Sequence, residues 1–222
     1  MKSNESLQHD VQEALKWEPL IRAAEIGVTA KDGIVTLTGT VNSFTKKLEA
    51  ENAAKNVTGV KAVVEKIEIN LSSFGKKDDE DIARDVLNAY SWNMEIPKDL
   101  VKVKVENGWV TLEGNLQWNF QKRAAATSIR YIPGIKGITN HITVHTDTVD
   151  IIEKRNIEHA LSRSWSISDK DIHVSVHGNK VTLRGKVHSL YQKEQAENIA
   201  WNAHGVLAVD NELVIEYQYS YS

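Results

Sequence analysis

The strongest constraint on this chain is a sequence motif that occurs three times. Alternating apolar and polar residues between two glycines are found at Gly33–Gly39, at Gly108–Gly114 and, slightly longer, at Gly178–Gly185. We call the second glycine of each segment the closing glycine. A further glycine follows each closing glycine at a constant separation, and a tryptophan precedes each closing glycine at a nearly constant separation. The following glycines are Gly59, Gly134 and Gly205, and the preceding tryptophans are Trp17, Trp92 and Trp165. Landmarks that recur at nearly fixed spacing indicate a tandem repeat, so we expect three small folding units.

The expected units are repeat 1 (residues 3–71), repeat 2 (78–146) and repeat 3 (149–217). A polar segment that contains Gly75 separates the first two, and a shorter segment near 146–150 separates the last two. Units of about 70 residues are small but can fold alone.

Each repeat is predicted to have the order α-β-β-α-β. Apolar residues at three- and four-residue spacing predict the first helix, and the alternation in 101–105 predicts the first strand. Asp32-Gly33 and Asn107-Gly108 are preferred in tight hairpin turns, so a second strand follows and is expected to end at the closing glycine. The resulting fold class is α+β: three tandem αββαβ units, each a three-stranded mixed sheet with two helices on one face. The other sheet face is expected to be bare.

The second helix of each repeat has its own start signal. Ser43 is expected to begin it in repeat 1, and Ser189 with Gln192 has the spacing of a capping box in repeat 3. Trp118 occupies the corresponding position in repeat 2. Alanines recur along all three helices and would let them lie close to the sheet.

These motifs resemble the BON domain (bacterial OsmY and nodulation) family, and the resemblance covers nearly the whole chain. The residues that carry it are Val35–Gly39 with Gly59-Val60, Val110–Gly114 with Gly134-Ile135, and Val181–Gly185 with Gly205-Val206. The resemblance implies a non-enzymatic protein without catalytic residues, associated with osmotic and envelope stress and with binding to phospholipid surfaces.

Composition excludes several functional classes. The chain has no cysteine, which rules out disulfides, thiol nucleophiles and Cys-ligated metal sites. Its net charge of −3 argues against bulk attraction to nucleic acid. The sequence contains no G-x-S-x-G, phosphate-binding glycine loop or H-E-x-x-H motif, and we expect no enzyme activity, cofactor or metal. No apolar run suggests a leader or a transmembrane helix, so the expected location is the cytoplasm, although members of the family are often periplasmic.

The candidate binding surface is the bare sheet face. A tryptophan beside lysines suits a lipid interface, because the indole can lie at headgroup level while the ammonium groups meet phosphate. The residues expected to contact a lipid or a partner are Lys102, Lys104, Trp109, Trp118, His173, His177, Lys180 and Arg184. Alternatively, Trp109 packs against a neighbouring repeat and the histidines are merely solvated. A metal site at His173 and His177 is disfavoured, because four residues of a strand span roughly 13 Å.

The recurring tryptophans lie at the predicted end of the first helix. Because Trp17, Trp92 and Trp165 occur in every repeat, we interpret them as packing residues, with a repeated ligand site as the minor alternative.

Two functional hypotheses follow. The first is a non-enzymatic tandem module that binds anionic phospholipid or an envelope-associated protein, with binding that weakens in salt and on Trp109→Ala. The alternative is a protein-interaction or self-assembly scaffold that acts through sheet edges or bare sheet faces.

Overall fold

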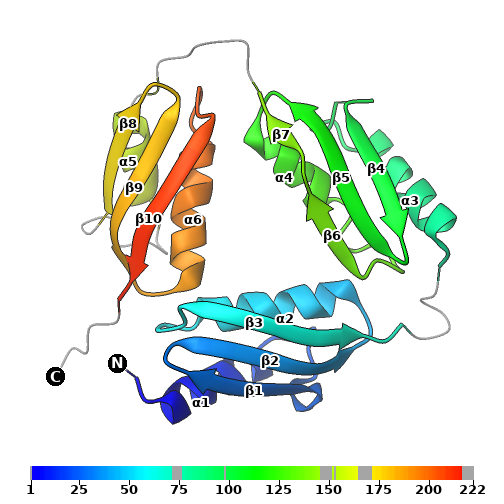
Figure 1. Ribbon diagram of the computed structural model, residues 1–222, viewed down its shortest axis with the longest axis vertical. Coiled ribbons are helices and arrows are strands. Elements are labelled where there is room, and N and C mark those ends of the chain that lie inside the picture. The colour runs from blue at the N-terminus through cyan, green and yellow to red at the C-terminus, as the bar shows by residue number, and fades with distance from the viewer. Residues whose placement is uncertain are drawn as a thin grey trace. The chain divides into compact units, whose positions relative to one another are not determined.

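The computed structural model describes residues 2–71, 77–97, 99–145, 152, 154–164 and 172–216 (Figure 1). Repeat 1 comprises α1 (Asn4–Lys16), the short 3₁₀ helix η1 (Ala23–Glu25), β1 (Ile26–Lys31), β2 (Ile34–Val41), α2 (Phe44–Asn56) and β3 (Ala62–Ile69). Repeat 2 comprises α3 (Asp79–Trp92), β4 (Val101–Glu106), β5 (Trp109–Leu116), α4 (Asn119–Thr127), β6 (Gly137–Asn140) and β7 (Thr143–Val144). Repeat 3 comprises α5 (Lys154–Ser162), β8 (Ile172–His177), β9 (Lys180–Val187), α6 (Leu190–Trp201) and β10 (Ala208–Ile215).

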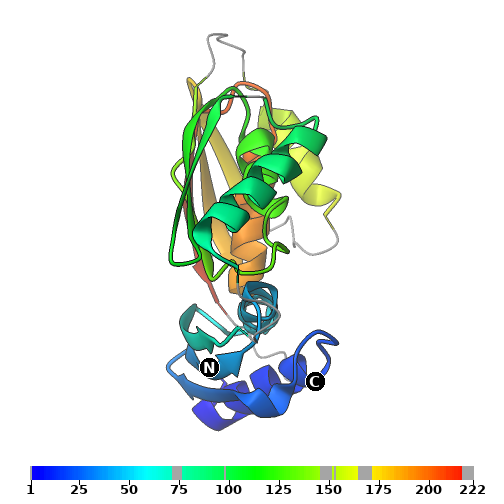
Figure 2. The same ribbon diagram turned by 90° about the vertical axis from the view of Figure 1, so that its right-hand side faces the viewer.

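The predicted α+β fold with αββαβ units is confirmed. In each repeat the first two strands form an antiparallel hairpin, and the third strand lies beside the second. The third strand is parallel to the second in repeats 2 and 3. In repeat 1, hydrogen bonds from Lys61 N to Gly33 O and from Asn70 N to Val41 O at the two ends of the pair give β3 the same direction. Both helices cover one face of each sheet, as Figure 2 shows for the green sheet of repeat 2.

The hairpin turns follow from their residues. Both turn residues have positive φ in repeat 1 (Asp32 53°, Gly33 88°) and in repeat 2 (Asn107 53°, Gly108 81°), as a type I′ turn requires. Repeat 3 has glycine first in its turn, Gly178, with φ 57°.

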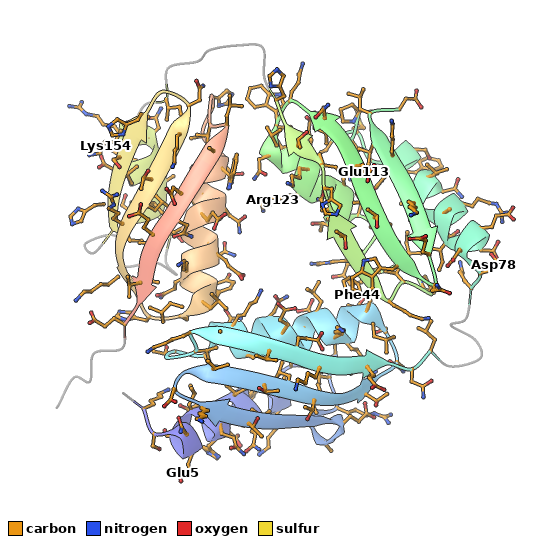
Figure 3. All side chains as sticks on the ribbon, in the orientation of Figure 1. Glu5, Phe44, Asp78, Glu113, Arg123 and Lys154 are labelled. Atoms are coloured by element: carbon orange, nitrogen blue, oxygen red, sulfur yellow. The ribbon has the colours of Figure 1, made fainter. Side chains whose placement is uncertain are left out.

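The N-terminus of the first helix is tied to the hairpin. Asp78, labelled in Figure 3, caps α3 by accepting a hydrogen bond from Asp81 N at 2.8 Å. The next residue, Asp79, accepts from the turn amides of Asn107 and Gly108 at 2.7 and 2.8 Å. Asn4 does the same for Asp32 N in repeat 1 at 2.8 Å. These bonds fix the helix on the sheet at the turn end.

The core of each repeat lies between the middle strand and the two helices. Apolar side chains of β2, β5 and β9 alternate into it and are fully buried. The small side chain of alanine lets the second helix of each repeat approach the sheet closely. The buried alanines of these three helices are Ala50, Ala54, Ala124, Ala125, Ala196 and Ala200. These positions agree with the sequence pattern.

The middle strand does not end at the closing glycine as predicted. It continues for two further residues in every repeat, and Val41, Leu116 and Val187 at its end are buried. The closing glycine instead has φ of +132°, +149° or +130° and allows the continuing strand to bend close to the start of the first strand.

The second helix begins as the serines predict. Ser43 Oγ accepts from Lys46 N at 3.3 Å, and Ser189 Oγ accepts from Gln192 N at 3.2 Å. An indole cannot accept such a bond. In repeat 2 the Trp118 amide instead donates to Gln121 Oε1 at 3.1 Å, which is one half of a capping box.

A buried phenol joins the two helices of repeat 2. Tyr90 Oη donates to the carbonyl of Ala125 at 3.0 Å, and burial raises the pKa of Tyr90 above its ordinary value. Because folding favours the neutral phenol, the stability that depends on it is complete below pH 10 and is lost as the pH rises further.

Replacing Tyr90 with phenylalanine is expected to lower the free energy of unfolding of repeat 2 by about 1 kcal/mol, because the buried hydrogen bond is lost while the ring stays. Amide hydrogen exchange of peptides from 78–146 measures this change without interference from the other repeats. The exposed Tyr131 gives the control, Tyr131→Phe, which should leave exchange unchanged. An equal effect of both substitutions on hydrogen exchange would contradict the stabilising role of the hydrogen bond from Tyr90 to Ala125.

Candidate functional site

The open face of repeat 2 places outward side chains in rows across the sheet. Cross-strand register gives the rows Glu106–Trp109–Gly137 and Lys104–Thr111–Thr139. Lys102 lies opposite Glu113, which is labelled on β5 in Figure 3. Lys104 and Glu106 form an ion pair at 3.1 Å. The strands of this face therefore carry two lysines and two glutamates, and their formal charges cancel.

Trp109 lies over its neighbouring strand. A Cβ atom added to Gly137 would come within 2.5–2.6 Å of three carbons of the Trp109 six-membered ring, so the indole occupies the space above this glycine. Its Nε1 donates to Thr139 Oγ1 at 2.8 Å. The side chain is still 48% exposed. The structure thus places Trp109 on the open face, as predicted, and also holds it in one orientation there.

The open face of repeat 3 carries cross-strand ion pairs. Lys180 pairs with Asp210 at 2.8 Å, Arg184 with Glu212 at 2.6 Å, and Lys186 with Glu216. The hydrogen bond between Arg184 and Glu212 holds the pKa of Glu212 below its ordinary value and that of Arg184 above it. Exposed pairs of this kind stabilise little. Their consequence is that the predicted cations of repeat 3 face carboxylates of the same sheet.

The two histidines of the predicted site stand at opposite ends of β8. His173 lies opposite Arg184 and His177 lies opposite Lys180, and both are exposed. Trp118 precedes α4 and lies beyond the end of β5, so it does not belong to the open face. Of the eight predicted residues, the structure brings Lys102, Lys104 and Trp109 together on one face and His173, His177, Lys180 and Arg184 together on another.

Repeat 1 presents a third kind of face. Its outward residues on β2 include Ile34 and three threonines, with the exposed Val64 on β3. The threonine at the centre of the middle strand is common to all three faces: Thr36, Thr111 and Thr182. Because the residues around it differ in type and charge, the open faces do not repeat one ligand-binding chemistry.

The recurring tryptophans provide a more similar surface. Trp17 is 84% exposed and Trp92 is 87% exposed. The prediction that they pack into their repeats is therefore wrong for both, and Trp165 lies outside the described residues. The physical reason is helical phase: Trp17 follows the buried Leu15 by two residues, or about 200° of helix, and Trp92 follows the buried Tyr90 in the same way.

The turn after each exposed tryptophan has the same hydrogen bonds in repeats 1 and 2. The side chain of the next residue accepts from the amide two positions further on, from Leu20 N to Glu18 Oε1 at 3.5 Å and from Glu95 N to Asn93 Oδ1 at 2.9 Å. The carbonyl of that same residue accepts from an isoleucine amide, from Ile21 at 3.1 Å and from Ile96 at 3.2 Å. We call residues 17–21 and 92–96 the tryptophan loops.

Both tryptophan loops expose further apolar surface. Leu20 is 50% exposed in the loop of Trp17, and Met94 is fully exposed in the loop of Trp92. In repeat 2 the loop is anchored by Ile96, which is buried in the core of the repeat. An anchored turn that holds large apolar side chains in solvent is typical of a contact surface.

The family to which these units belong follows from comparison with known proteins. Residues 3–70, 78–146 and 152–217 each match the BON domain. The chain belongs to the BON domain family.

These BON domains are similar in sequence to Osmotically-inducible protein Y of Escherichia coli (strain K12), with 26% identity over 136 residues, or 60% of this chain and 68% of that protein. Two solved structures of CdsD, described as a structural protein of the type III secretion system of Chlamydia trachomatis, align over 95% of this chain and 92% and 98% of theirs. Both alignments have 18% identity and a TM-score of 0.26, which does not indicate a common arrangement of the whole chains.

Within the described parts of the three BON domains, no group of three or more His, Asp or Glu side chains is arranged to hold a metal ion. In the same residues no helix has the length and apolar character needed to cross a bilayer. In these BON domains the open sheet faces and the tryptophan loops both present large side chains to solvent.

Proposed function

We propose that this chain is a non-enzymatic stress protein that binds phospholipid surfaces, and that the tryptophan loops of repeats 1 and 2 make the contact. The stress role is supported by the BON family and by the similarity to a protein named for osmotic induction. The observation that carries the lipid proposal is the exposure of two indoles on matching turns. Tryptophan favours the interface between lipid and water, where its ring is buried among headgroups and its N–H stays hydrated.

The charged side chains of the open faces and the tryptophan loops give little support to a target that is strictly anionic. Lys180 and Arg184 on the open face of repeat 3 are paired with carboxylates, and the lysines of repeat 2 share their face with two glutamates. The tryptophan loops themselves include Glu18 and Glu95. Binding is therefore expected to depend mainly on apolar insertion, with anionic phospholipid as one suitable surface among others.

The test uses the full chain with vesicles of phosphatidylcholine alone and of phosphatidylcholine with phosphatidylglycerol, each at low and high salt. We expect cosedimentation with both compositions, little loss of binding in high salt and a shift of tryptophan emission to shorter wavelength. Absence of binding to both vesicles at low salt would overturn the proposal. Binding to the anionic vesicles alone that disappears in high salt would assign the contact to the lysines of the open faces and overturn the role of the loops.

A further inference from the structure

The orientation of Trp109 differs from that of the exposed loop tryptophans in a way that suits a different ligand. One part of its ring lies over Gly137, and Nε1, the only polar atom of the side chain, donates a hydrogen bond to Thr139 Oγ1 at 2.8 Å. The indole thus lies along the sheet instead of projecting from it. A ring held in this way has little to insert into a bilayer, but it offers a fixed apolar surface to a flat ligand.

The other two repeats lack this arrangement. Ile34 and Lys180 occupy the position of Trp109 at the start of the middle strand. In repeat 3 the residue opposite Lys180 is Ala208, where repeat 2 has Gly137. Tryptophan and glycine thus occur as a pair in repeat 2, and the contact distances explain the pairing, because a Cβ at 137 would collide with the ring.

The surroundings of the ring are polar and electrically balanced. Glu106 lies directly opposite Trp109, and its side chain is 65% exposed. Lys104, 66% exposed, is its ion-pair partner. Thr111 lies opposite Lys104 in the next row. β4, on the side of β5 away from the strand that the ring covers, thus carries a carboxylate and an ammonium group, and β5 itself carries a hydroxyl. Together these groups accept and donate hydrogen bonds with no net charge.

We propose that Trp109, Glu106 and Lys104 form a carbohydrate-binding site that takes a β-linked, glucose-type pyranose. The axial C–H groups on one face of such a sugar carry partial positive charge and are attracted to the negative face of an aromatic ring. Its equatorial hydroxyls extend sideways, where the Glu106 carboxylate accepts hydrogen bonds and the Lys104 ammonium donates them. A neutral ligand matches the balanced charge of the site.

The test measures binding of chitotriose and cellotriose to the full chain by NMR chemical-shift perturbation. We expect saturable shifts at the Trp109 indole N–H and at backbone amides of β4–β6 for at least one trisaccharide, and loss of the backbone shifts in Trp109→Ile, which introduces the residue of repeat 1. Gly137→Ala keeps the tryptophan but displaces its ring, so affinity is expected to fall about tenfold. Ile34→Ala, at the same position in repeat 1, is the control and should bind like the unmodified chain.

Three results would overturn this proposal: no shift with either sugar, equal binding by Trp109→Ile, or full affinity in Gly137→Ala. Thermal unfolding of each variant shows whether repeat 2 is folded during the measurement. If Trp109→Ile weakens vesicle binding and no sugar binds, the carbohydrate site is excluded, while phospholipid binding stands with the open face of repeat 2 added to its contact surface.

Discussion

Substitution of Gly114 by alanine is expected to unfold repeat 2. A Cβ atom at this position would lie 2.1 Å from the carbonyl oxygen of Leu100 and 3.5 Å from Val101 Cα. These nearby atoms belong to the backbone at the start of β4, so no side-chain rotation relieves the collision. The residue also has φ +149°, a conformation that alanine rarely adopts. We expect a loss of at least about 3 kcal/mol, which approaches the whole stability of a domain of this size.

Hydrogen exchange measured by mass spectrometry can show this loss repeat by repeat. Peptides from 78–146 should lose protection in Gly114→Ala while those from the other repeats retain most of theirs. Gly178→Ala is the matched control, because that glycine has φ +57° but no atom within 4 Å of its added Cβ. It should cost about 1 kcal/mol, the ordinary penalty of left-handed backbone for an L-residue. Similar costs for the two substitutions would show that the close approach to β4 is not what requires glycine.

The fold could be predicted because its determinants are local and repeated. Asp32-Gly33 and Asn107-Gly108 specify the turn through their own backbone preferences, and the alternation of residues 101–105 specifies which face is buried. The same approach failed at the closing glycines, because the partner that requires glycine there, the carbonyl of Leu100 in repeat 2, is distant along the chain. A local pattern indicates a special residue, but it does not reveal whether the strand ends or bends there.

The candidate site was less predictable because exposure depends on helical phase more than on recurrence. Trp17 and Trp92 precede their closing glycines at the same separation, whereas Trp165 stands closer to its own. The available signal that Trp17 and Trp92 are exposed was their helical phase relative to the apolar positions Leu15 and Tyr90. The ion pairs of repeat 3 could not be foreseen, because they depend on the register between β9 and β10. The repeat limits, the compartment and the binding role of the open-face residues stay predictions.

Removal of both loop tryptophans is expected to give the largest loss of vesicle binding. A tryptophan side chain has about 200 Å² of surface, and burial of roughly 80 Å² of it at about 25 cal/mol per Å² contributes about 2 kcal/mol. Trp17→Ala and Trp92→Ala should therefore each weaken binding roughly 30-fold. If both loops engage one vesicle, the double variant should lose about a thousandfold, because the second contact is made at high effective concentration.

Stability should not change in these variants, since both indoles are almost fully exposed. If the stability of a variant is unchanged, its loss of vesicle binding is not caused by a loss of folding. Leu87→Ala is the matched control, because Leu87 is an exposed apolar residue of α3 outside the tryptophan loop, and it should bind as the unmodified chain does. Unchanged vesicle binding in the double variant would remove the loops from the mechanism. A double variant no weaker than one of the singles would assign the contact to one loop, and the matching turn in the other repeat would then serve the fold alone.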